Sequence, residues 1–501
     1  MRRARRVARG RSASDHDAAI SHQRANLSGI CELEDRRDCG LPAPISGLVL
    51  FSQRRRRPSF CNLGAKSKMR SSRSLVVLVF TLTVVALIAQ SSAVAQSARR
   101  PNIVYILADD LGWKDVGFHG SDIKTPNIDE LARTGARLEQ FYAQPMCTPT
   151  RAALMTGRYP VRYGLQTLVI PASMSYGLPT DEWLLPQALK EAGYATAIIG
   201  KWHLGHAQSR YWPMQRGFDY QYGPLLGEID YYTHAIGGKT DWFRNEKPLK
   251  EQGYVSTLLG EDAVHFIERQ DANKPFFLYL AFTAPHTPFQ APQKYLAMYA
   301  DISDSNRRSY AAMITAMDDQ IGAVMQALQR RGLRDNTVVI FHSDNGGNQS
   351  PHLAGESEVK GKLPADNGPY RGGKGDLYEG GMRVASLINW HAKIPAGTVI
   401  DQTMHVVDYY PTLVNLAGGS LAKSKPLDGL DLAHDQRGQT LAARRGYLQR
   451  RAFPWRGSAR RLEARLARDP ALEARIVQPR PGSKRKEQYG GSEWTKSQRA
   501  A

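Results

Sequence analysis

Four apolar segments of strand length constrain the fold of this chain more than any other feature. Each is almost continuously apolar, and they are NIVYILA (102–108), ATAIIG (195–200), FFLYLAF (276–282) and TVVIFHS (337–343). Such continuity is typical of strands that are buried on both faces of a sheet. Helical patterns separate these segments, at 125–135, 184–194 and 309–332. The alternation predicts the α/β class, with a large, mostly parallel or mixed central sheet flanked by helices on both faces.

The helical patterns carry recognisable boundaries. Thr125 and Pro126 are typical of an N-cap and a first helical position. Gly193 and Gly332 lie at the ends of the other two patterns and predict where those helices end. The last helix presents an apolar stripe, which predicts a face packed in the core, and its members are Met313, Met317, Ile321 and Met325.

The positive charge of the chain lies at its two ends. The 501 residues carry a formal net charge of +20, of which residues 1–100 contribute +13 and residues 433–501 contribute +11. Residues 101–432 therefore carry −4. They hold no stripe of Lys and Arg with interleaved aromatic residues, so we predict no nucleic-acid partner.

Residues 69–95 have the features of a signal peptide. Met69 is followed by two arginines, by the 15-residue apolar run 75–89 and by small residues at 93–95. The run is shorter than the roughly 20 residues of a spanning helix. We therefore predict an exported protein, periplasmic or secreted, with no stable membrane span after cleavage; an uncleaved anchor is the alternative. Residues 1–68 are then a basic extension that is either disordered or not translated.

Polar residues follow each apolar strand directly. Asp109 and Asp110 follow the first, Lys201 and His203 the second, His286 the third, and Asp344 and Asn345 the fourth. Ligands of open α/β sheets bind at the carboxyl ends of the strands. Three carboxylates and an amide oxygen suit a hard cation, Ca²⁺ or Mg²⁺, and the glycines after residue 345 permit close backbone approach. Each acidic pair alone could instead be a solvated turn or a helix cap.

Cys147 is the only cysteine between residue 101 and the C-terminus, and it lies in the segment CTPTR (147–151). A lone cysteine in an exported protein has no internal disulfide partner. It is either a buried structural residue or a residue with a chemical role.

The pattern Cys-x-Pro-x-Arg, followed by Thr-Gly-Arg, resembles the sulfatase signature. From residue 101 to about 431 the chain is similar to sulfatases of the alkaline-phosphatase-like superfamily, and most of all to arylsulfatase B-like enzymes. The resemblance is carried by GRYPVRYGLQ, LPQALKEAGYATAIIGKWHLG, FHSDNGG and YRGGKGDLYEGGMRV. It implies a sulfuric ester hydrolase whose cysteine is converted to formylglycine by a formylglycine-generating enzyme. Residues 96–432 are then the catalytic domain.

The resemblance also implies the site residues. A calcium ion would be held by Asp109, Asp110, Asp344, Asn345 and an oxygen of the converted Cys147. The implied catalytic residues are Cys147, Arg151, Lys201, His203, His286 and Lys374.

A chemical role is implied for each of these residues. The hydrated aldehyde at residue 147 attacks the sulfur, while the metal, Lys201 and Lys374 offset the sulfate charge. Arg151 orients the diol, and His203 takes its proton as the intermediate collapses. Either His286 or Lys374 protonates the departing alcohol. Taken singly, each helper could be an ordinary surface, loop or core residue. We interpret Arg158, Arg162 and the pair 318–319 as structural.

The resemblance ends near residue 432, where the family continues into a small antiparallel domain. Residues 433–501 are Arg-rich and lack strand alternation. They are either a disordered tail or the product of a reading-frame error, so the small domain is missing or disrupted. The predicted substrate is a sulfate ester, with sulfated sugars as one class. The alternatives are a phosphodiesterase or phosphonate hydrolase of the same architecture, or a catalytically dead glycan-binding module.

Overall fold

The structure is a computed structural model that describes residues 78, 100–353 and 359–432. The chain divides into two units, residues 1–83 and 84–501, and the fold below concerns the second unit. The predictions for residues 1–68, 69–95 and 433–501 lie outside the described residues. None of the described helices is long and apolar enough to cross a membrane.

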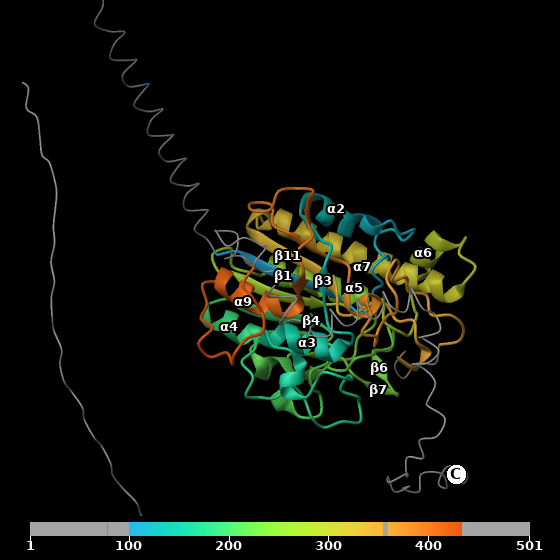
Figure 1. Cartoon of the computed structure of the whole chain (residues 1–501), viewed down its shortest axis with the longest axis horizontal. Helices are drawn as coiled ribbons and strands as arrows, with labels where there is room; N and C mark the ends of the chain where they lie inside the picture. Colours follow the sequence, from blue (N-terminus) through green and yellow to red (C-terminus); the bar gives the residue numbers. More distant parts are fainter. Residues whose placement is uncertain (1–77, 79–99, 354–358, 433–501) are drawn as a thin grey trace, which may run out of the picture. The chain divides into compact units, whose positions relative to one another are not determined.

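Within the described residues, ten strands form one mixed sheet (Figure 1). Its order is β13 (Thr398–Ile400), β2 (Ala136–Leu138), β12 (Ser386–Asn389), β11 (Thr337–Ser343), β1 (Asn102–Ala108), β10 (Phe276–Ala281), β4 (Ala195–Gly200), β5 (Tyr220–Gly223), β8 (Phe243–Arg244) and β9 (Lys247–Pro248). The five strands from β11 to β5 are parallel, whereas β12 and β8 pair antiparallel on either side of them. The predicted mixed sheet is therefore confirmed. Two small pairs lie apart, β3 (Phe141–Tyr142) with β14 (Met404–His405) and β6 (Ala235–Ile236) with β7 (Lys239–Thr240).

Helices cover both faces of the sheet, as the sequence predicts (Figure 1). One face carries α2 (Pro126–Thr134), α5 (Val255–Glu268), α6 (Gln293–Leu296) and α7 (Ser305–Arg330). The other face carries α3 (Cys147–Thr156), α4 (Leu185–Glu191) and α9 (Tyr409–Leu416). The short helix α8 (Glu379–Met382) lies next to β12 in the sequence.

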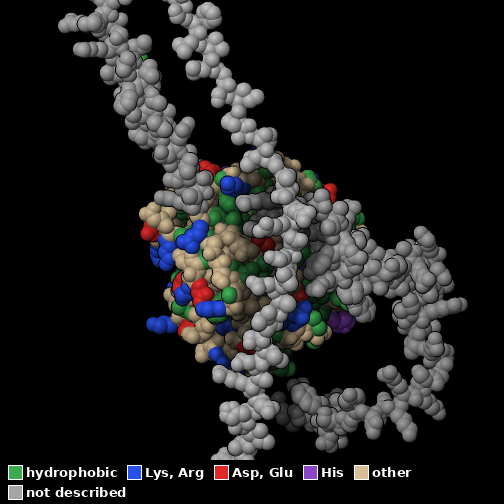
Figure 2. Space-filling model, turned by 60° about the vertical axis from the view of Figure 1, so that its left-hand side comes forward, with side chains coloured by type: hydrophobic (Ala, Val, Ile, Leu, Met, Phe, Trp, Pro, Cys, Tyr) green, Lys and Arg blue, Asp and Glu red, His purple; other side chains and the backbone are tan. Residues whose placement is uncertain are grey.

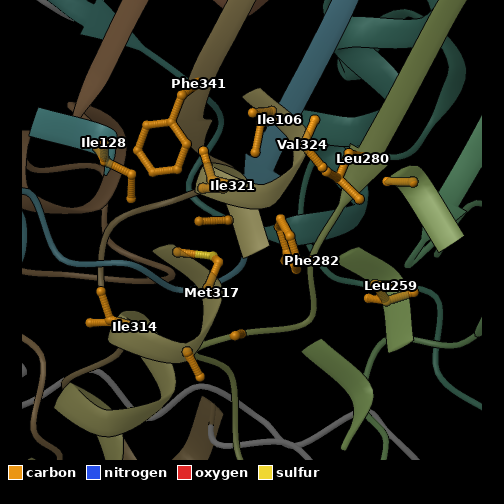
Figure 3. Packing of buried hydrophobic residues seen from close by; sticks show 14 of the residues in the cluster. Ile106, Ile128, Leu259, Leu280, Phe282, Ile314, Met317, Ile321, Val324 and Phe341 are labelled. Carbon is orange, nitrogen blue, oxygen red and sulfur yellow. The ribbon is translucent and has the colours of Figure 1, made fainter. Parts of the chain in front are cut away.

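The central strands are buried on both faces because each supplies side chains to two cores. Along β1, Val104 and Ile106 point into the core beneath α7, whereas Ile103 and Tyr105 point into the core beneath α3 and α9. Figure 3 shows the first core, in which Met317 and Ile321 of α7 face Phe341 and Ile106 of the sheet. Met313, Met317 and Ile321 of the predicted stripe are buried in this core, and Met325 is partly buried against it. This two-sided burial explains the continuous apolar runs.

The helix boundaries follow the sequence with two differences. Gly193 and Gly332 both have positive φ just beyond α4 and α7. Helix α7 begins at Ser305, earlier than predicted, because the Asp304 carboxylate accepts the N–H of Arg307. At α2 the N-cap position is Thr125, but its hydroxyl makes no cap bond. The carboxylate of Asp318 in α7 caps the helix instead, because it accepts the N–H groups of Asn127 and Ile128 at 3.1 and 2.8 Å.

Charges of both signs share the protein surface. On the face drawn in Figure 2, Lys and Arg side chains lie among Asp and Glu side chains. This mixture fits the small net charge of residues 101–432.

Candidate functional site

The site lies at the carboxyl edge of the parallel strands. Because β1, β4, β10 and β11 run parallel and are neighbours, the polar residues that follow them meet at one edge of the sheet. Asp109 and Asp110 follow β1, Lys201 follows β4, and Asp344 follows β11. The side chains of these residues are almost completely buried. The sequence predicted this convergence.

Cys147 is the first residue of α3 and is buried. Its thiol donates to Oδ1 of Asp109, with Sγ and Oδ1 3.4 Å apart. Burial raises the pKa of the thiol well above its usual range, and the Asp344 carboxylate adds to this shift. The unconverted cysteine is therefore a neutral thiol at physiological pH and a poor nucleophile.

Three cations neutralise the three carboxylates. Lys201 Nζ donates to Asp109 Oδ2 at 2.5 Å. Arg151, one helical turn after Cys147, donates from Nε and Nη2 to Asp344 Oδ2 at 3.1 and 2.9 Å. Its Nη1 donates to the carbonyl oxygen of Lys201 at 2.8 Å. Because each cation is paired and hydrogen bonded, the charges can remain buried.

Lys374 supplies the third cation, from the Gly-rich loop after residue 370. Its Nζ lies 2.8 Å from Asp110 Oδ2 and 3.1 Å from His286 Nε2. Burial alone would raise the pKa of Asp110, but the charges of Lys374, His286 and Lys201 and the hydrogen bond from Lys374 together outweigh burial and lower the pKa to about 2. Burial would lower the pKa of Lys374, but the neighbouring acidic groups, Asp110 first among them, together outweigh burial and hold the pKa above its usual range. Both groups are charged at neutral pH.

The two histidines of the site are buried and neutral. Burial, followed by the charges of Lys201 and Arg151, holds the pKa of His203 well below its usual range. Burial and the charge of Lys374 lower the pKa of His286 to about 4. His286 Nδ1 lies 2.8 Å from the carbonyl oxygen of Thr287. Since a carbonyl only accepts, Nδ1 carries the ring proton and Nε2 accepts from Lys374.

The residues at the site fit a bound calcium ion. Ligand atoms of Asp109, Asp110, Cys147 and His286 lie within 4.8 Å of one another. Asn345 donates from Nδ2 to Asp110 Oδ1 at 2.7 Å. Its buried Oδ1 has no hydrogen-bond partner among the described residues. A buried oxygen without a partner is costly, and a cation would satisfy it. His286 was not in the predicted ligand set, and its Nε2 is already bonded to Lys374.

The glycines after Asn345 serve close packing, as predicted. A Cβ on Gly346 would lie 1.7 Å from the carbonyl oxygen of Gly380, and one on Gly347 would lie 2.4 Å from the Cβ of Ala365. No larger residue fits there without a backbone shift, so the loop that carries Asn345 depends on both glycines.

Sequence reasoning missed several residues that hold the site. The Tyr231 hydroxyl lies 2.7 Å from the carbonyl oxygen of Thr283 and 3.0 Å from that of His286. The Tyr310 hydroxyl accepts the N–H of Gly112 at 3.0 Å and so supports the turn after Asp110. These are tyrosines on distant elements, and no local pattern in the sequence singles them out.

The residues interpreted as structural are engaged in packing. Arg158 pairs with Glu182 and donates to the carbonyl oxygen of Pro426. Arg162 pairs with Asp428. Both pairs tie the segment after α3 to other loops.

Together, the fold and this site define an α/β protein that gathers acids and cations around one buried cysteine. The Sulfatase family matches residues 101–420. The chain is 42% identical to arylsulfatase J of Mus musculus over 342 residues, which are 66% of this chain and 55% of that protein. It is 36% identical to N-acetylgalactosamine-6-sulfatase of Homo sapiens over 353 residues, 66% of this chain and 65% of that protein.

Solved structures agree with the sequence comparison. The crystal structure of Ps i-CgsB in complex with k-i-k-neocarrahexaose is similar, with a TM-score of 0.62 and 37% identity, over 68% of this chain and 76% of that one. The protein therefore belongs to the sulfatase family, and the predicted family and fold are confirmed. The chain spans less than two thirds of the length of arylsulfatase J and N-acetylgalactosamine-6-sulfatase, at 55% and 65%.

Proposed function

We propose that this protein hydrolyses sulfate monoesters, with sulfated saccharides as the substrate class. One observation carries the proposal: a single buried cluster of side chains combines the carboxylates of Asp109, Asp110 and Asp344 with three cations around Cys147. A sulfate ester is an anion, and paired cations with fixed geometry are suited to stabilise charge that develops on its oxygens. The names of both relatives support a sulfate ester as substrate. The name N-acetylgalactosamine-6-sulfatase and the saccharide in the Ps i-CgsB complex support the saccharide class.

Two groups complete the proposed site. Formylglycine, made from Cys147 by a formylglycine-generating enzyme, would supply a hydrated aldehyde as the nucleophile. Calcium, held by Asp109, Asp110, Asp344, Asn345 and an oxygen of the converted residue, would supply positive charge close to the sulfate. The unpartnered Oδ1 of Asn345 supports this ligand set.

The cations of the chain bind and orient the reacting groups. Arg151 is fixed by Asp344 and by the carbonyl of Lys201, so its guanidinium holds a set position one turn from residue 147. Lys201 and Lys374 donate hydrogen bonds to the sulfate oxygens. The ring of His203 is neutral at neutral pH, because its pKa lies well below its usual range, so a ring nitrogen without a proton is available to act as the base.

The geometry favours Lys374 as the acid that protonates the leaving alcohol. His286 carries its ring proton on Nδ1, which is bonded to the Thr287 carbonyl. Its Nε2 has no proton to give and accepts from Lys374, which lies 3.1 Å away. Lys374 holds its proton as an ammonium, and His286 orients it.

Sulfate release tests the proposal directly. Matured protein is assayed with an aryl sulfate, an aryl phosphate and a panel of sulfated saccharides, and the Cys147 peptide is examined by mass spectrometry. We expect sulfate release that scales with formylglycine content and disappears in Cys147→Ala. A preference for the aryl phosphate would indicate a phosphoryl hydrolase, and turnover by protein with only unmodified cysteine would refute the mechanism.

Export of the protein is part of the proposal. The predicted signal peptide, residues 69–95, has the composition that directs export. N-terminal sequencing of the native protein checks this prediction. A mature terminus near residue 96 is expected, and one well upstream of that position would refute it.

A further inference from the structure

A three-residue hydrogen-bond network holds the ring of His203. The Thr148 hydroxyl, immediately after Cys147, donates to the carbonyl oxygen of His203 at 2.9 Å. The hydroxyl oxygen of Thr148 also accepts the N–H of Ile170 at 3.1 Å. The Ile170 carbonyl oxygen in turn lies 3.2 Å from His203 Nε2. One hydroxyl thus joins the start of α3, the segment that contains Ile170 and the loop after β4.

This network selects one tautomer of the ring. A carbonyl oxygen only accepts hydrogen bonds, so Nε2 must carry the proton that points to Ile170. In a neutral imidazole the other nitrogen, Nδ1, then has a free lone pair. Nδ1 is buried and has no hydrogen-bond partner among the described residues. The ring therefore presents an unprotonated nitrogen that nothing in the described structure occupies.

The ring has little freedom to leave this orientation. The N–H of His203 donates to the Leu225 carbonyl at 3.0 Å, and the residue has a φ of 59°. Gly227 lies against the ring so closely that a Cβ there would be 2.1 Å from Cε1. The Thr148 hydroxyl holds Ile170 by its N–H, and so keeps the carbonyl oxygen of Ile170 at the distance that Nε2 requires.

We propose that Thr148 is a positioning residue that fixes His203 in the Nε2-protonated tautomer, so that Nδ1 is the atom that accepts a proton in the pocket. When Nδ1 takes up a proton, Nε2 keeps its own proton, which stays hydrogen bonded to the carbonyl oxygen of Ile170. The dipole of that carbonyl stabilises the imidazolium that forms. This inference deepens the proposed function and rests on it for the role of the base. The tautomer itself does not depend on turnover.

The test compares Thr148→Val, which keeps the shape but removes the hydroxyl, with Thr148→Ser, which keeps the hydroxyl. Thr156→Val is the matched control: Thr156 is a buried threonine on the same helix, and its hydroxyl bonds to Ala152 rather than to His203. The ring nitrogens of His203 are observed by ¹⁵N NMR in unconverted protein, with the signals assigned by His203→Gln. Turnover is expressed per formylglycine, because residue 148 adjoins the maturation site.

We expect wild-type protein and Thr156→Val to show a protonated Nε2 and a bare Nδ1, and Thr148→Val to show a mixture of tautomers. In Thr148→Val, kcat per formylglycine falls at least about tenfold while KM changes less than about threefold, and Thr148→Ser restores kcat to within about threefold of wild type.

Three results would overturn the inference: a protonated Nδ1 in wild-type protein, an unchanged tautomer and kcat in Thr148→Val, or an equal loss in the serine variant. If the tautomers behave as expected but no variant, wild type included, releases sulfate, the positioning role stands and the proposed function fails.

Discussion

Replacing Gly227 by alanine should displace the ring of His203 and reduce turnover. The added Cβ would lie 2.1 Å from Cε1, 2.5 Å from Nε2 and 2.6 Å from Nδ1 of that ring. Non-bonded carbons pack at about 3.5–4.0 Å, so the ring must retreat by more than about 1 Å. The backbone N–H of His203 is hydrogen bonded to the carbonyl of Leu225, and its Nε2 to the carbonyl of Ile170. Displacement of the ring therefore breaks at least one of these hydrogen bonds.

The expected losses follow from this displacement. A misplacement of about 1 Å in a catalytic group costs about 100-fold in rate, and overpacking of a dense site costs about 1–3 kcal/mol of stability. The rate is measured as sulfate released from an aryl sulfate per formylglycine. Stability is measured by urea unfolding of the unconverted protein.

Gly164→Ala is the matched control for Gly227→Ala. Gly164 has a φ of +81° and no atom within 4 Å of an added Cβ. Alanine there should cost about 1–2 kcal/mol through backbone strain alone, without loss of kcat. Folded Gly227→Ala protein with wild-type kcat would show that the ring position is unimportant, and would refute the reasoning.

Three further predictions concern the cation and the scaffold. Calcium at 100 times its Kd should stabilise the unconverted protein by about 2.7 kcal/mol, measured as a rise in Tm that a chelator reverses. Asn345→Leu should abolish this rise in Tm. An equal rise in that variant would contradict the ligand set. Asp318→Ala should cost about 1–2 kcal/mol in urea unfolding, because it uncaps α2. Arg158→Ala should cost about 1–3 kcal/mol, since the buried Glu182 carboxylate loses this partner and is left with Lys425, 3.2 Å away, whereas Arg162→Ala, at a half-exposed side chain, should cost less than about 1 kcal/mol. Equal losses in the two arginine variants would contradict this reasoning.

Much of the fold could be read from local pattern. The apolar runs gave the four central strands because a strand buried on both faces has no polar positions to interrupt it. The same runs located the site, since the residues that follow parallel strands must meet at one edge. The family resemblance placed Cys147, Arg151 and Lys374 in that site, and the structure brings their side chains to its carboxylates.

Contacts between distant segments could not be read in this way. The cap of α2 comes from Asp318, whereas the local pattern at Thr125 predicted a cap from the residue itself. The support of His286 by Tyr231 likewise joins segments 55 residues apart. Such hydrogen bonds depend on how layers pack, and no spacing in the sequence encodes them.

The sequence by itself determined the class of fold, the family and the types of group at the site, because strand burial and residue chemistry are local properties. Tertiary structure alone decided which groups pair: Lys201 with Asp109, Arg151 with Asp344 and Lys374 with Asp110. It also decided which histidine nitrogens carry protons. Both depend on distances of a few ångströms between loops, and only the packed sheet and its helices set those distances.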